Sequence, residues 1–165
     1  MKPRIITGPE QVIDLPRGKL QCKITGPDRD ADVADAIAAA RSAVEAELGL
    51  PIGDQVREYT YATWCGSVTL PCDVSELQAV SAAGVPVDPL PVLVGRTLTF
   101  PAASPVVIRI RCGWTAETLP ATVKMAMLLL IADYVRNPQA HTESQLFKNG
   151  ALDGLLWPER ERLPL

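Results

Sequence analysis

The most apolar run of the chain, Leu119–Asn137, repeats with the period of a helix. At 3.6 residues per turn its apolar positions form two stripes on nearly opposite sides. Pro120 suits a first helical turn, and Asn137 before Pro138 ends the helix. A helix that is apolar on two sides is buried on both, so we predict a helix over about 120–136 whose second side is available to a neighbouring subunit. The first stripe comprises Val123, Met127, Leu130 and Tyr134, the second comprises Ala121, Met125, Leu128, Ala132 and Val135, and Leu129 interrupts a polar strip of Thr122, Asp133 and Arg136.

A second amphipathic helix is predicted over about 30–48. Acidic residues gather before it, where the positive end of a helix dipole favours them, and Gly49 with Pro51 ends it. Its apolar stripe comprises Val33, Ile37, Ala40, Val44 and Leu48. The other side carries Ala38, Ala39 and Ala46. This alanine-rich side fits either simple helix propensity or the close approach of another helix or subunit.

The stretch Leu15–Ile24 is compatible with two structures. Asp14 and Pro16 are typical of a helix start, and Thr25-Gly26-Pro27 is typical of its end, which predicts a short helix over about 16–23. Leu20, Cys22 and Ile24 also alternate with polar residues, as in a strand. Periodicity alone leaves both open.

Between about 55 and 112 the pattern changes to that of β structure. The clearest strand is Val106–Cys112, in which apolar residues alternate with Arg109 and Arg111. Gly95-Arg96 fits a two-residue hairpin turn, and five prolines between 86 and 105 imply short strands. The expected strands are Gln55–Trp64, Ser67–Leu70, Val74–Ala82, Pro91–Val94, Thr97–Phe100 and Val106–Cys112. We therefore expect an α+β fold, with a mainly α-helical core and a small antiparallel β insertion at about 52–114.

The C-terminal part is predicted to contain a loop and a tail. His141–Gly150 is polar and fits a flexible loop, which would close a single domain spanning residues 1–150. Residues 151–165 are predicted to be an extended docking tail, because their few apolar residues cannot build a core alone.

Composition narrows the range of functions. The 165 residues carry a net charge of −3, which argues against a protein that grips phosphates. Met125–Ala132 is too short to span a bilayer, and no apolar core follows the basic N-terminus. We therefore expect a cytosol-like compartment, no membrane association, and four reduced cysteines.

Candidate catalytic chemistry is sparse. His141 is the only histidine, no C-x-x-C pair is present, and no nucleotide-binding or nucleophile-elbow motif occurs. Arg109 and Arg111 could touch phosphate, although a solvated outer strand face explains them as well. We expect no catalytic, cofactor-binding or metal-ligating residues, and hence no enzyme and no cofactor. The two alternatives are an accessory factor that binds nucleic acid during DNA packaging, and a small cysteine-dependent hydrolase that requires His141.

The order of these pieces resembles the head–tail connector (adaptor) family of tailed phages, the gp6-like connectors. The resemblance rests on the acidic helix start at Asp28, the strand ending Arg-Cys-Gly-Trp at Trp114, and the apolar helix that begins at Leu119-Pro120. The closing Gly154-Leu-Leu-Trp-Pro-Glu-Arg looks like the family's Leu-Leu-x-Pro-Tyr-Arg tail, with Glu159 in place of the tyrosine. The stretch from Lys19 to Ile24 matches a short N-terminal helix in the family, which favours the helical alternative there.

The resemblance implies a non-enzymatic structural protein of the virion, located at the head–tail junction after assembly in the host cytoplasm. Family members form rings, usually dodecamers, between the portal protein and the tail-completion proteins (a stopper or a tail terminator). Genomic DNA passes through the lumen without sequence-specific binding, and a net-acidic chain would not grip it. We predict that the tail docks on the portal or a neighbouring subunit through Leu152, Leu155, Leu156, Trp157 and Arg160. We also predict that Met125, Leu128 and Ala132 contact either the β segment or a neighbouring subunit.

Overall fold

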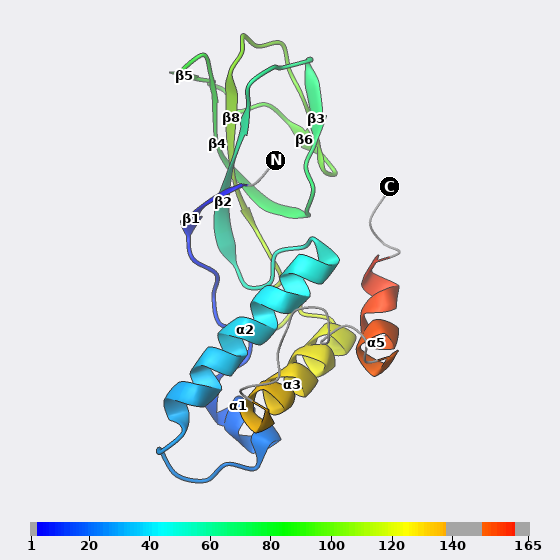
Figure 1. The fold of residues 1–165 in the computed structure, drawn as a ribbon. Helices are drawn as coiled ribbons and strands as arrows, with labels where there is room; N and C mark the ends of the chain where they lie inside the picture. Colours follow the sequence, from blue (N-terminus) through cyan, green and yellow to red (C-terminus); the bar gives the residue numbers. More distant parts are fainter. Residues whose placement is uncertain (1–2, 138–149, 161–165) are drawn as a thin grey trace. The chain divides into compact units, whose positions relative to one another are not determined.

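The computed structural model describes residues 3–137 and 150–160, which form two compact units (Figure 1). The β unit combines the N-terminal residues up to Glu10 with Leu50–Thr115. The helical unit combines Gln11–Gly49 with the described residues from Ala116 onward. Each unit is therefore built from two separate stretches of the chain.

The β unit contains two antiparallel sheets. A five-stranded sheet has the order β1-β2-β8-β4-β5, and a three-stranded sheet has the order β3-β7-β6. The hairpin predicted at Gly95-Arg96 is confirmed, since Val94 pairs with Thr97 across it. The strands are β1 Arg4–Thr7, β2 Gln55–Tyr61, β3 Ser67–Thr69, β4 Val74–Ala82, β5 Val85–Pro86, β6 Leu93–Val94, β7 Thr97–Thr99 and β8 Val106–Cys112.

The central strand β8 shows why the sheet has one buried side. Its residues alternate, so that Ile108, Ile110 and Cys112 are fully buried while Arg109 and Arg111 lie on the outer face. This alternation was predicted from the sequence. The pairing of β1 with β2 was not, because Arg4–Thr7 lies far outside the predicted insertion and joins the sheet as an edge strand.

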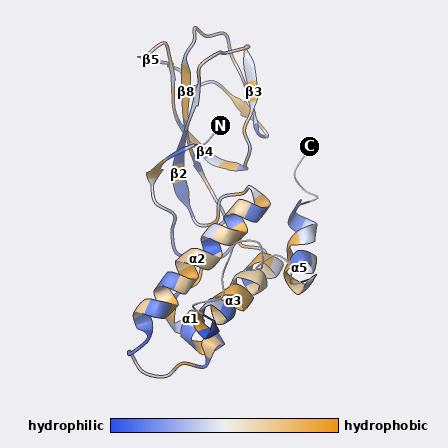
Figure 2. Ribbon diagram, viewed as in Figure 1, coloured by the Kyte–Doolittle hydropathy of each residue, from blue (hydrophilic) through white to orange (hydrophobic). Residues whose placement is uncertain are grey.

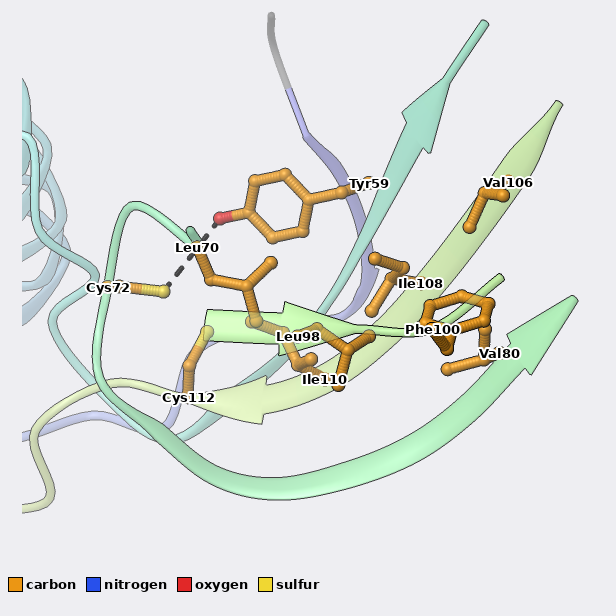
Figure 3. Close-up of a cluster of buried hydrophobic side chains, with 10 residues drawn as sticks. All are labelled: Tyr59, Leu70, Cys72, Val80, Leu98, Phe100, Val106, Ile108, Ile110 and Cys112. Atoms are coloured by element: carbon orange, nitrogen blue, oxygen red, sulfur yellow. Dashed lines mark hydrogen bonds between the residues drawn. The ribbon is translucent and has the colours of Figure 1, made fainter. Parts of the chain in front are cut away.

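The β unit has a hydrophobic core of its own, shown in Figure 3. With this core, the expectation of a mainly α-helical core is not confirmed: the described residues are roughly 37% helix and 27% strand. Side chains from both sheets fill it, so the strands are not a small appendage on a helical core. The buried members of the cluster are Tyr59, Leu70, Cys72, Val80, Leu98, Phe100, Val106, Ile108, Ile110 and Cys112.

Residues 53–113, which hold every strand except β1, begin and end at one point, which we call the stem. Ile52 and Trp114 form a parallel bridge there, and Gly53 N donates to Trp114 O at 2.8 Å. Gly113 has a φ of 111°, and a Cβ at this position would lie 2.1 Å from the carbonyl oxygen of Gly53. Only glycine allows the two strands of the stem to approach this closely.

The described part of the helical unit contains the helices α1 Leu15–Cys22, α2 Asp30–Leu48, α3 Ala121–Arg136 and α5 Gly150–Arg160. The helical alternative for Leu15–Ile24 is confirmed: the Asp14 side chain accepts a hydrogen bond from Arg17 N at 2.9 Å and caps α1. Gly18 lets α1 approach α2, because a Cβ there would lie 2.9 Å from Ile37 Cδ1. Helix α3 packs against α1, α2 and α5 and is hydrophobic over most of its length (Figure 2).

The C-terminal segment differs from its prediction as an extended tail. Gly150–Arg160 forms α5, which packs against α3 and α2. Two glycines and Pro158 lower its intrinsic helix propensity, so the helix depends on the partners that bury its apolar side. His141 and the predicted loop lie outside the described residues. No helix in the described ranges is long and apolar enough to cross a membrane.

Candidate interaction site

The outward side of α3 is an exposed helix face with two large apolar side chains. Met125 is 47% exposed and Leu129 is 36% exposed, and Ala121 and Arg136 lie on the same side. We call these four residues the α3 outer face. Exposed apolar side chains on a helix that is otherwise buried are typical of a contact surface.

The structure divides the residues predicted for this surface. Met125 lies on the α3 outer face, Ala132 is half-buried, and Leu128 is only 2% exposed because it packs inside the unit. Leu129 takes the outward position instead. The exposed line follows the i, i+4 spacing, whereas the predicted stripe continued from Met125 to Leu128. Whether Met125 and Ala132 contact a neighbouring subunit stays a prediction.

A groove lies between the start of α2 and the end of α3. Its volume is about 470 Å³, and its lining includes Asp32, Asp35, Ala39 and Tyr134. Arg29 joins the two helices at this end, since its Nη2 donates to Val135 O at 3.0 Å and its Nε lies 3.1 Å from Asp32 Oδ2. Asp35 is exposed and has no ion pair among the described residues. The groove is therefore apolar in its walls and acidic at its rim.

Helix α5 presents only part of the predicted docking surface. Leu152 and Leu156 face inward and are buried against the helical unit, whereas Leu155 is half-buried and Trp157 is 57% exposed. Arg160 pairs with Glu47 on α2 and with Asp153, the latter at 3.0 Å. The helical period explains this division, because positions four residues apart share one side. Docking of these residues on a portal or a neighbouring subunit stays a prediction, and Trp157 is the side chain most available for it.

The arginines on the outer face of the sheet are paired with carboxylates. Arg109 Nη2 lies 2.8 Å from Glu58 Oε2, and Arg111 Nε donates to both Asp54 oxygens at 2.8 and 2.9 Å. The hydrogen bond from Arg111 holds the pKa of the Asp54 carboxyl below its ordinary value. Paired guanidinium groups make a weak phosphate-binding surface, which argues against the nucleic-acid alternative.

The buried cysteines form a small polar cluster inside the β unit (Figure 3). Cys72 Sγ lies 3.8 Å from the Tyr59 hydroxyl oxygen. The neighbouring Cys112 thiol above all, and the Tyr59 hydroxyl as well, lower the pKa of Cys72 to about 7, against the effect of burial. A hydrolase would need a base beside this thiol, and His141, the only histidine, lies outside the described residues. In residues 3–137 and 150–160, no group of histidine, cysteine and carboxylate side chains could hold a metal ion.

Comparison with known proteins identifies similar folds. No protein-family profile matches the chain, and no curated protein matches its sequence. Solved structures of gene transfer agent (GTA) particles do match. The fold is shared with chains from GTA necks.

Three of these structures cover nearly the whole chain. A chain from the neck of a native GTA particle with C12 symmetry matches with a TM-score of 0.77 and 19% identity, over 100% of this chain and 98% of that one. A chain from the virion of a native GTA particle gives 0.71 and 17%, over 90% and 94%. A chain from the neck of an empty GTA particle with C6 symmetry gives 0.70 and 17%, over 86% of each. At these identities the likeness to the GTA chains shows a common fold.

Sequence reasoning missed two features of the candidate site. The first is Leu129, which the two-stripe pattern placed among polar residues. The second is the groove at Asp35 and Tyr134, because no sequence signal pairs the beginning of α2 with the end of α3. The alanine-rich side of α2 was recognised, and Ala38, Ala39 and Ala46 are all exposed.

Proposed function

We propose that the protein is a structural neck component of a phage-like particle, a head–tail connector (adaptor) that forms a ring. The observation that carries this proposal is the match over the whole chain to a chain from a neck with C12 symmetry. The ring would be a dodecamer of this chain, located at the head–tail junction of the virion after assembly in the host cytoplasm. Its other partners would be the portal protein on one side and a stopper or tail terminator on the other.

The surface chemistry supports a passive role around DNA. The chain carries a net charge of −3, and the outer arginines of the β unit are already paired with Glu58 and Asp54. A lumen that repels or ignores phosphates lets a duplex slide, whereas a basic one would hold it. We therefore propose a DNA channel without sequence-specific contacts and a protein without enzymatic activity.

The exposed faces of the helical unit support assembly. A ring needs two different surfaces on each subunit, one for each neighbour. The α3 outer face is apolar and exposed, and Trp157 on α5 is a large exposed aromatic side chain of the kind that anchors interfaces. Both surfaces would be covered in a neck.

The test is the size and shape of the protein, alone and together with the portal protein of the same particle. Native mass spectrometry and electron microscopy should show closed rings of about twelve copies with an open centre, as cyclic symmetry requires. A protein that stays monomeric in both samples would contradict the proposal. A monomer that instead binds DNA with a steep salt dependence would favour the packaging-factor alternative.

A further inference from the structure

The helical unit has two separate exposed surfaces, one on α2 and one on α3. The two helices pack against each other, and each keeps a side that is open to solvent. On α3 this side is the outer face with Met125 and Leu129. On α2 it carries Asp35, Ala38 and Ala39, which are all exposed.

The two surfaces have complementary shapes. Met125 and Leu129 are large flexible side chains that project from α3. The outward side of α2 offers the small side chains Ala38, Ala39 and Ala46, which are all exposed. Small side chains allow another helix with large side chains to approach closely.

The two surfaces also have complementary charge. Arg136 lies on the α3 outer face, seven residues after Leu129 and therefore almost in line with it. Asp35 lies at the rim of the groove, and neither residue has an ion pair within the described part of the helical unit. Asp32, the other acid of the rim, is already paired with Arg29.

The positions of these charges agree with a ring. Arg136 and Asp35 lie at the same end of the helix pair, the end where Arg29 bonds to Val135 O. Rotation about a ring axis does not change height along that axis. An axis that runs along the helix pair therefore brings Arg136 of one copy opposite Asp35 of the next.

We propose that the α3 outer face of one copy docks on the α2 side of the next copy, with Met125 and Leu129 against the alanine side and Arg136 paired with Asp35. The contact is head-to-tail, since it joins two different surfaces, and repeating it closes a ring. This inference rests on the proposed function and names the surfaces that the ring uses.

Charge reversal tests the pairing. Arg136→Glu and Asp35→Arg, each alone, place like charges opposite each other and should weaken ring assembly at least about tenfold in subunit concentration. The double variant Arg136→Glu with Asp35→Arg restores the opposite charges and should recover assembly. Lys124→Glu is the matched control: it makes the same change of charge on α3, about 120° around the helix from Arg136, and should leave assembly unchanged.

Cysteine cross-linking gives an independent measurement. In a Cys65→Ser background, which removes the exposed native thiol, Met125→Cys and Ala46→Cys should form disulfides between copies under mild oxidation. Met125 lies 11 residues before Arg136 and Ala46 lies 11 residues after Asp35, so the proposed contact places them at the same height. Within one copy these positions lie on separate exposed surfaces, so the band on a non-reducing gel must be a dimer or a larger oligomer. Each single-cysteine variant serves as its control.

The outcomes separate this inference from the proposed function. All variants are assayed under the conditions in which the unmodified protein forms rings, with the portal protein where it is required. Rings that tolerate both charge reversals and show no Met125–Ala46 cross-link would overturn the proposed contact and leave the neck function standing. No rings under any condition would overturn both. Rescue by the double variant together with the cross-link would establish the contact.

Discussion

Individual residues in the stem of the β unit combine backbone strain with close packing. Gly113 occupies a left-handed conformation, and its missing Cβ makes room for the carbonyl oxygen of Gly53. Gly95, in the β6–β7 turn, also has a positive φ of 60° but has open space around it. Alanine substitutions at the two glycines therefore separate the free-energy cost of a left-handed conformation from the cost of a steric collision.

We predict that Gly113→Ala lowers the free energy of unfolding of the β unit by about 3 kcal/mol or more, because strain and a backbone collision add. Gly95→Ala should cost only about 1 kcal/mol, since only the left-handed conformation is penalised. Urea denaturation followed by circular dichroism measures both. Equal losses in the two variants would show that the close approach at Gly53 has no energetic weight.

The pair of Arg111 and Asp54 should make stability depend on pH in the acid range. The hydrogen bond from Arg111 lowers the pKa of Asp54 in the folded state below its ordinary value of 3.8. The stabilisation is therefore complete above that value and is lost as the pH falls through the lower folded pKa. Asp54→Asn should lower the melting temperature at pH 7, and the difference from the unmodified protein should shrink toward zero at strongly acid pH. A difference that persists unchanged in acid would mean that the charge of Asp54 contributes nothing.

At the scale of the elements, helix α5 shows how a weak helix is held in place. It has only 11 residues, and helices of that length are marginal in water on their own. The inward pair Leu152 and Leu156 and the ion pair between Arg160 and Glu47 supply the missing stabilisation. Docking on α3 and α2, rather than local propensity, keeps this segment helical.

We predict that Leu156→Ala releases α5 from the helical unit, at a cost of about 2–4 kcal/mol for removing a fully buried leucine side chain. Amide hydrogen exchange should show the loss of protection in Gly150–Arg160, with little change in α2. Trp157→Ala is the matched control, because its side chain is mostly exposed, and it should change protection by less than about 0.5 kcal/mol. Equal deprotection by the two variants would contradict the inward docking of Leu156.

The sequence predicted the elements whose signals are local. The limits of α2 and β8 agree with their predictions, because an apolar period together with caps or strict alternation identifies them residue by residue. Two features depended on distant partners and were not predicted. Arg4–Thr7 becomes a strand only because β2 offers an edge, and the exposure of Leu129 in place of Leu128 depends on which helices surround α3.

At the scale of the whole molecule, the chain forms two compact units, whereas the sequence pattern predicted a single domain over residues 1–150. The β unit has its own core and a charge-paired outer face, and the helical unit carries the α3 outer face that the proposed ring contact would cover. The α+β fold was predicted, but a mainly helical core was not confirmed, because short alternating strands give a weaker sequence signal than a long apolar helix. The resemblance to connectors came from the order of elements, and order is the property that a shared fold preserves at 17–19% identity.

The stem has a consequence for how such a protein can change. Ile52 and Trp114 are bridged side by side, so the ends of the 61 residues between them, 53–113, are only about 5 Å apart. A cassette with neighbouring ends can be lengthened, exchanged or excised while the sequence on either side keeps its spacing. Residues 53–113 are thus a natural site for grafting, provided that the replacement offers an edge strand to β1, and the helices of the other unit would stay the same.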